Sequence, residues 1–253
     1  QWHQSFGGSQ SDKANHIQQT SDGGYIISGT TRSYGFGGSD IWLIKTDSQG
    51  NLIWEKTYGG AYYEEAHDIV RIETGGYAII GEKCPDTPSH CTNATRVMYL
   101  EIDNGGNQVS SNIFNRNGFC SGHAITTTHD GGIAWVGERG NYNLWMYQWD
   151  SNNQPLEVTE QLGPGYGIEK TDDGGYVIST GSYIIKTDSE FNFDEWMNSE
   201  DEINQLPNQF ELSQNYPNPF NANTNIAYKV YEETFVQIII YDLLGNQIKE
   251  LVN

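Results

Sequence analysis

Short apolar runs with a two-residue alternation recur four times in the first three quarters of the chain, each after a glycine-rich turn. The four copies are Ser21–Gly29, Thr74–Gly81, Asp130–Gly137 and Asp173–Gly181. Their second glycines stand at positions 24, 76, 132 and 175, so the steps are 52, 56 and 43 residues. A period near 50 with β-type content is typical of propellers and similar arrays. We therefore predict an all-β, propeller-like array of about four four-stranded blades.

Each repeat is predicted to hold four strands, and those of the first blade are Trp2–Phe6, Ala14–Thr20, Tyr25–Thr31 and Ile41–Asp47. The last of these is almost continuously apolar at its centre, as expected of a strand that neighbouring blades cover on both faces. The second blade is predicted to open at Leu52, with Trp54 52 positions after Trp2.

A further opening strand is predicted at Phe193–Met197, where Trp196 corresponds to Trp2 and Trp54. One opening strand is then surplus to a closed ring of four blades. A surplus strand can close the ring, or it can pair with another subunit.

The Asp-Gly-Gly turns have a mechanical explanation. A tight hairpin needs a residue with positive φ, which glycine adopts without steric cost. The preceding aspartate can accept a hydrogen bond from the backbone two residues later. Calcium binding by these aspartates is the alternative, but the Asp-x-Asp-x-Asp-Gly spacing of an EF-hand is absent. We favour the turn interpretation and predict no cofactor, with calcium as the weaker alternative.

The composition changes after the repeats. Residues 1–198 are predicted to form the repeat domain, residues 199–205 an acidic linker, and residues 206–253 a second, small β-domain. Three prolines, at positions 207, 217 and 219, exclude a helix from the start of this domain. Three strands are expected at Asn225–Val230, Thr234–Tyr241 and Gln247–Val252.

The second domain carries a specific motif, made of Asn215, Tyr216, Pro217, Asn218, Pro219, Phe220 and Asn221. With the run from Val236 to Gly245, the motif resembles the type A C-terminal sorting domain of cargo of the type IX secretion system. The resemblance implies a small β-sandwich, contact with the secretion machinery, and an extracellular or cell-surface location in a Gram-negative bacterium. We expect the sandwich to be incomplete, because the family's remaining strands would follow Asn253.

The repeat region resembles the secreted, propeller-like repeats that often precede such sorting domains. The shared pattern includes the Lys-Thr-Asp ends at Lys45–Asp47 and Lys186–Asp188. This resemblance implies a fold and no defined activity.

Composition excludes several partners. The formal net charge is −20, from 33 acidic and 13 basic residues, so phosphates of nucleic acids and anionic membranes would be repelled. No apolar run reaches the roughly 18 residues of a membrane helix, and we predict no transmembrane segment.

Three cysteines are present. Cys84 and Cys91 bracket a proline-rich insertion, and a disulfide between them is expected. Free thiols, or a zinc site that includes His90, are the alternatives. Cys120 is then left over and is expected to be a small buried residue.

No catalytic motif is visible: the sequence lacks a Gly-x-Ser-x-Gly elbow, a His-Glu-x-x-His pair and a Walker loop. We therefore predict no catalytic or metal-binding residues and no enzyme, with a catalytic domain upstream as the alternative. His16, His67 and His123 fall on the second strands of successive blades, though not in one aligned position. Packing is favoured for them over a shared metal.

Aromatic residues in predicted loops are candidates for contact with a glycan or a protein partner, namely Tyr34, Phe36, Tyr62, Tyr63 and Tyr142. These observations lead to the hypothesis of a secreted structural or adhesive protein, exported by a type IX-like route and able to self-associate into a filament through strand pairing. The alternatives are a carbohydrate-binding module that uses the loop aromatics, and the non-catalytic part of a larger secreted enzyme.

Overall fold

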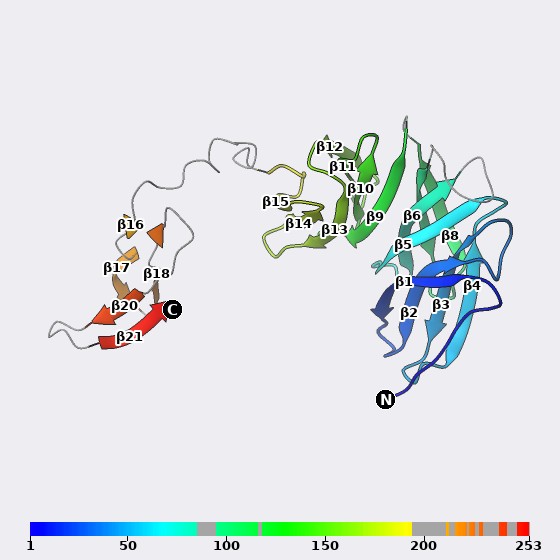
Figure 1. Cartoon of the computed structure of the whole chain (residues 1–253), viewed down its shortest axis with the longest axis horizontal. Helices are drawn as coiled ribbons and strands as arrows, with labels where there is room; N and C mark the ends of the chain where they lie inside the picture. The colour runs from blue at the N-terminus through cyan, green and yellow to red at the C-terminus, as the bar shows by residue number, and fades with distance from the viewer. Residues whose placement is uncertain are drawn as a thin grey trace. The chain divides into compact units, whose positions relative to one another are not determined.

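The structure, a computed structural model, describes residues 1–84, 95–115 and 118–193, and further strand segments at 211–212, 216–221, 223–225, 228–229, 238–241 and 247–252. The chain divides into two compact units, Gln1–Phe193 and Asp194–Asn253. Every regular element in the described part is a β-strand (Figure 1), which confirms the all-β prediction. None of the described residues forms a helix of the length and apolarity that crossing a bilayer requires.

The first unit is a row of antiparallel sheets, in each of which consecutive strands are neighbours. Its strands are β1 Asp12–Gln19, β2 Tyr25–Thr31, β3 Asp40–Thr46, β4 Leu52–Tyr58, β5 Tyr63–Arg71, β6 Tyr77–Cys84, β7 Arg96–Ile102, β8 Gln108–Phe114, β9 Cys120–Thr127, β10 Ile133–Arg139, β11 Asn143–Trp149, β12 Pro155–Glu160, β13 Gly165–Lys170, β14 Tyr176–Thr180 and β15 Ile184–Thr187. Three sheets have four strands, β1–β4, β5–β8 and β9–β12, and the described part of the fourth has three, β13–β15. The predicted array of about four blades is confirmed.

The predicted phase of the blades is wrong by one strand. Leu52–Tyr58 was expected to open the second blade, but as β4 it pairs with β3 and is the last strand of the first sheet. The reason is local: after β3 the chain reverses in a tight turn, in which the backbone N–H of Asp47 donates to the carbonyl of Asn51. A tight turn joins neighbouring antiparallel strands, so the two runs belong to one hairpin.

The first predicted strand is also wrong. Trp2–Phe6 has no strand pairing in the structure. Most of the predicted Phe193–Met197 strand lies outside the described residues. The prediction of one surplus opening strand therefore loses its basis in the blade count.

The two glycines of each repeated turn serve different purposes. Gly23 has a φ of +81°, which is the left-handed conformation expected for the turn. Gly24 has no such φ; a Cβ on Gly24 would lie 2.1 Å from the backbone carbonyl oxygen of Thr46, so no side chain fits. Asp22 accepts from the backbone N–H of Gly24 at 3.1 Å, which confirms the predicted two-residue hydrogen bond.

The sheets pack face to face through three apolar cores, one between each pair of neighbours. The first core joins Ile26 and Leu43 of one sheet to Ile79 and Leu100 of the next. The second holds the largest fully buried side chains, Trp135 and Trp145, whose rings meet edge to face at 4.9 Å. Apolar side chains on both faces of the middle strands thus let each sheet cover the next.

The second unit holds short strand pairs. Its strands are β16 Glu211–Leu212, β17 Tyr216–Asn221, β18 Asn223–Asn225, β19 Tyr228–Lys229, β20 Ile238–Tyr241 and β21 Gln247–Val252. They pair antiparallel as β16 with β19, β17 with β18, and β20 with β21. Of the predicted strands, Gln247–Val252 has the expected bounds, and Thr234–Tyr241 is described only from Ile238 onwards. Of the predicted strand Asn225–Val230, Asn225 ends β18 and Tyr228–Lys229 form β19, and its other residues lie outside the described part of the chain.

Candidate functional site

A bulge interrupts the first strand of each of the four sheets in the first unit, and its extra residue is Asn15, His67, His123 or Tyr166. Three of these side chains bond to the next blade. The amide of Asn15 donates to the carbonyl of Ala66 at 2.6 Å, and the Nδ1 atoms of His67 and His123 lie 2.8 Å from the carbonyls of Gly122 and Gly165. A carbonyl oxygen only accepts, so each Nδ1 carries the proton.

The expectation that the histidines are not aligned is therefore corrected for two of them. His67 and His123 occupy equivalent bulge positions, and their rings lie 5.7 Å apart. His16 follows the bulge residue of its own sheet, and its Nδ1 lies 2.8 Å from a carboxylate oxygen of Asp68. A bulge shifts the alternation of side chains locally, which the spacing of residues in the sequence does not reveal.

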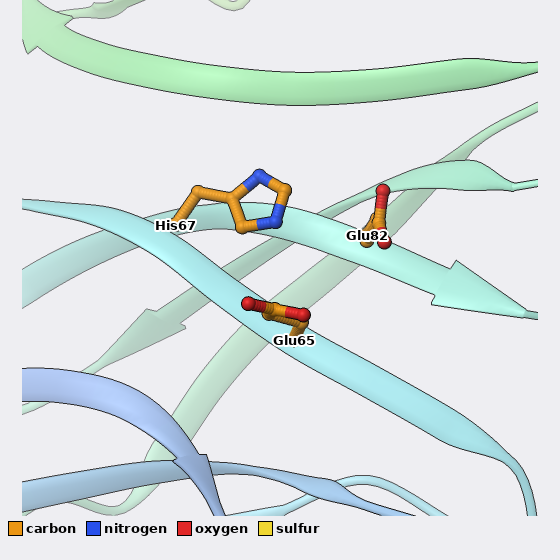
Figure 2. A group of neighbouring side chains, drawn as sticks. All are labelled: Glu65, His67 and Glu82. Atoms are coloured by element: carbon orange, nitrogen blue, oxygen red, sulfur yellow. The ribbon is translucent and has the colours of Figure 1, made fainter. Parts of the chain in front are cut away.

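At the second blade this row of bulges meets two carboxylates. Glu65 on β5 lies directly opposite Glu82 on β6 in the strand register, and His67 follows two residues after Glu65. One ligand atom from each of the three residues lies within 4.8 Å of the other two. Figure 2 shows the imidazole and both carboxylates turned toward one another over the two strands.

The surroundings of the two carboxylates shift their pKa values in opposite directions. Burial works to raise the pKa of Glu65, but hydrogen bonds from Tyr63 and Asn15 and the nearby His67 outweigh it and leave that pKa below its usual value. Burial raises the pKa of Glu82, and the charge of Glu65 adds to the effect. The cluster thus holds one carboxylate that stays ionised and one whose charge is costly without a compensating cation.

Negative charge extends into the next blade. The hydroxyl of Ser121 donates to Glu82 at 3.0 Å, and Glu138 beyond it is buried. Burial, followed by the charge of Glu82, raises the pKa of Glu138. Lys13 approaches from the first blade, 3.5 Å from Glu65, but its side chain is 68% exposed. An exposed ammonium group is screened by water and compensates the buried charge only weakly.

The first and fourth sheets each present an open face. Ile17, Ile69, Ile125 and Ile168 occupy the same position in the four sheets, each opposite the third residue of the next strand. The preceding blade buries three of them, with exposures of 2% for Ile69, 4% for Ile125 and 5% for Ile168, whereas Ile17 is 59% exposed. The face of the first sheet thus carries isoleucine at the same position as the internal faces, but this isoleucine is exposed to solvent.

The opposite face of the fourth sheet shows the same contrast. Leu43, Tyr99 and Met146 occupy one register position in the first three sheets and are 0%, 3% and 0% exposed. Ile184 has this position in the fourth sheet and is 71% exposed.

The N-terminal segment lies over part of the first face and leaves a groove of about 520 Å³, which residues of Trp2–Phe6 line together with β1 to β3. The indole of Trp2 donates to the carbonyl of Ser48 and lies against Gly50. Trp54 of the first sheet lies against Gly106 of the second in the same way. Trp2 therefore contacts the first sheet as a tryptophan of a preceding blade would.

The predicted aromatic contact residues are distributed over three loops and one strand. Phe36, 81% exposed, and Tyr62 lie in neighbouring loops, where the backbone N–H of Gly38 donates to the carbonyl of Tyr62. Tyr34 packs on Trp42, and its hydroxyl donates to the carbonyl of Gly7. Tyr142 is exposed in the turn between β10 and β11 of the third sheet.

Tyr63 corrects the loop expectation, because it begins β5 and its hydroxyl donates to the carboxylate of Glu65. Glycan contact through the other aromatics stays a prediction.

The cysteines are described in part. Cys84 is disulfide-bonded, and Cys120 is a fully buried thiol. The expected partner Cys91, like His90, lies outside the described residues, as does Asn215 of the sorting motif. The remaining motif residues, Tyr216–Asn221, form β17.

Comparison with known proteins identifies the tail and the fold. Residues 214–253 match the family described as a secretion system C-terminal sorting domain. No curated protein sequence matches the chain. A solved structure of a protein of unknown function from Bacteroides caccae is similar over 73% of this chain and 60% of its own, with 13% identity and a TM-score of 0.51. That likeness concerns the fold alone.

A second solved structure belongs to a protein assigned only provisionally as a gluconolactonase, with 12% identity, a TM-score of 0.45, and coverage of 71% of this chain and 61% of its own. The chain thus spans about 60% of the length of both structures. The prediction that the chain is not an enzyme is corrected, because missing sequence motifs do not by themselves exclude catalysis. A likeness this distant assigns no activity either.

The sorting domain implies an interaction with the secretion machinery and places the protein at the cell surface or in the extracellular space. The chain is a secreted, propeller-like repeat protein that carries a type IX secretion system C-terminal sorting domain.

Proposed function

We propose that this exported protein is a structural component of a surface or extracellular assembly, in which copies join head to tail. In this arrangement the open face of the fourth sheet of one copy stacks on the open face of the first sheet of the next. The observation that carries the proposal is the exposure of Ile17 and Ile184 at positions that every internal blade buries.

The internal interfaces supply the chemistry of the proposed contact. Leu43 of the first sheet and Ile69 of the second belong to one core, and both are almost fully buried. The corresponding pair between two copies is Ile184 of one and Ile17 of the next. Two different faces that fit each other make a heterologous contact, which produces open chains of subunits unless the rotation closes a ring. Each copy carries a formal net charge of −20, so the copies repel one another, and salt screens this repulsion. We therefore expect weaker association at low salt.

In this arrangement the copies associate by stacking of sheet faces and not by pairing of a surplus strand. The ring of Trp2 packs on Gly50, where a tryptophan of another blade would pack. Trp2–Phe6 therefore has to move when a second copy binds. Removal of residues 1–8 is therefore expected to strengthen association rather than weaken it.

Two complementary variants test the proposal. Ile17→Asp disables one face and Ile184→Asp disables the other, so each variant alone is expected to stay monomeric in analytical ultracentrifugation at physiological salt. An equimolar mixture is expected to form dimers and nothing larger, because one intact face remains on each partner. Phe36→Asp, which changes an exposed aromatic side chain away from both faces, is the control and is expected to associate like the unchanged protein.

A protein that remains monomeric at concentrations on the order of 100 μM, with and without residues 1–8, would refute the proposal. So would association that Ile17→Asp and Ile184→Asp leave unchanged. Association abolished by Phe36→Asp instead would favour the loops as the contact.

A further inference from the structure

The second blade differs from the first at three register positions, and from the third at one of them, where Glu65 corresponds to Ser121. These positions carry Lys13, Asn15 and Thr30 in the first sheet, and Ser121, His123 and Glu138 in the third. In the second sheet they carry Glu65, His67 and Glu82. The scaffold is the same in all three sheets, so these side chains are not required by the fold of the blade.

His67 makes the hydrogen bond that is common for a metal-binding histidine. Its Nδ1–H donates to the carbonyl of Gly122 at 2.8 Å, which fixes the tautomer of the neutral imidazole, so that Nε2 is the nitrogen that can bind an ion. A metal-binding histidine commonly donates its other ring N–H to a backbone carbonyl in this way. Figure 2 shows the imidazole beside both carboxylates, as convergence on one ion requires.

The carboxylates are supported from outside as well. Glu65 accepts from the hydroxyl of Tyr63 and from the amide of Asn15, and Glu82 accepts from the hydroxyl of Ser121. Each carboxylate has more lone pairs than these bonds use, so oxygens remain for an ion. Hydrogen-bonded ligands of this kind are the usual outer shell of a metal site.

We propose that Glu65, His67 and Glu82 bind a divalent transition-metal cation on β5 and β6, the first two strands of the second blade. One imidazole nitrogen and two carboxylate oxygens suit Zn²⁺ or Mn²⁺ better than Ca²⁺ or Mg²⁺, which take oxygen ligands. Three protein ligands leave a coordination position for water or another small ligand. The site does not depend on the stacking of copies and goes beyond the structural role.

The test is a titration of the purified 253-residue chain with Zn²⁺ by isothermal calorimetry, after dialysis against a chelator. One ion per chain is expected at the site, with affinity reduced at least about 10-fold by His67→Gln and by Glu82→Gln. His129→Gln, which removes a histidine outside the cluster, is the matched control and is expected to bind like the unchanged protein. Circular dichroism of each variant checks that it folds.

A second measurement on the unchanged protein does not depend on the variants. In ¹⁵N spectra of the histidine side chains, one imidazole is expected to shift at Nε2 on addition of Zn²⁺ and to retain its Nδ1 proton. Absence of binding, or binding that survives both His67→Gln and Glu82→Gln in folded protein, overturns the proposal. Equal loss of affinity in His129→Gln would also overturn it, because the ion would then be held by scattered surface histidines.

Discussion

Alanine substitution of two isoleucines at equivalent positions, one buried and one exposed, tests whether the face of the first sheet is open. Ile69 and Ile17 share a register position, but Ile69 is 2% exposed within the first core and Ile17 is 59% exposed. Ile69→Ala removes buried methylene and methyl groups and leaves a cavity, for which a loss of about 2–5 kcal/mol is typical. Ile17→Ala removes groups that water already reaches, so we expect a loss below about 1 kcal/mol.

The assay is urea unfolding followed by circular dichroism, at low micromolar protein so that copies do not associate. Ile125→Ala is the second internal variant and is expected to resemble Ile69→Ala, because Ile125 is 4% exposed in the second core. Comparable losses for Ile17→Ala and Ile69→Ala in dilute protein would refute the reasoning, since they would require a covered first face. If copies stack as proposed, the cost of Ile17→Ala is expected to grow with protein concentration.

Three further predictions concern the turns and two carboxylates. Gly174→Ala is expected to lower the free energy of unfolding by about 1–2 kcal/mol, because of its positive φ alone. Gly175→Ala should lower it further, because a Cβ would lie 1.9 Å from the carbonyl oxygen of Thr187. Equal shifts of the two variants in thermal melts would contradict this. Burial, followed by the charge of Glu64, raises the pKa of Asp40 to about 6, so the stability that this group contributes is complete below its unfolded pKa near 4 and is lost as the pH rises toward 6. Asp40→Asn is therefore expected to raise the free energy of unfolding above pH 6, by at most about 3 kcal/mol, with little effect at pH 4; a pH-independent difference would refute the assignment. Burial works to raise the pKa of Asp12, but hydrogen bonds from Thr31, Gly8 and Ser33 outweigh it and lower this pKa to about 2. Asp12→Asn should therefore destabilise the protein above pH 4, and progressively less as the pH falls toward 2. Urea unfolding across this pH range measures the effect.

Much of the fold was predictable because each blade is a local structure. Alternating apolar runs define the strands, and the Gly-Gly turns define the hairpins between them. The phase of the blades was not predictable by similarity of segments alone. Leu52–Tyr58 resembles Trp2–Phe6 in sequence, yet the turn that begins at Asp47 binds it to the strand before it.

The candidate metal site was less predictable. From the sequence, packing is the favoured role of His16, His67 and His123, because histidines alone carry no ligand pattern. The cluster consists of one of them with two glutamates, one of which comes from the neighbouring strand. A signal was present in the repeat alignment: the second copy has Glu65, His67 and Glu82 where the first has Lys13, Asn15 and Thr30.

The sequence by itself determined the strand content, the repeat and the sorting tail, because alternation, turn chemistry and a short motif act over a few residues each. Only the tertiary structure decided which isoleucine is buried and which glutamates face a histidine. Burial and convergence depend on which sheet lies beside which and on where a bulge shifts the strand register, and both are properties of packing between segments far apart in the chain.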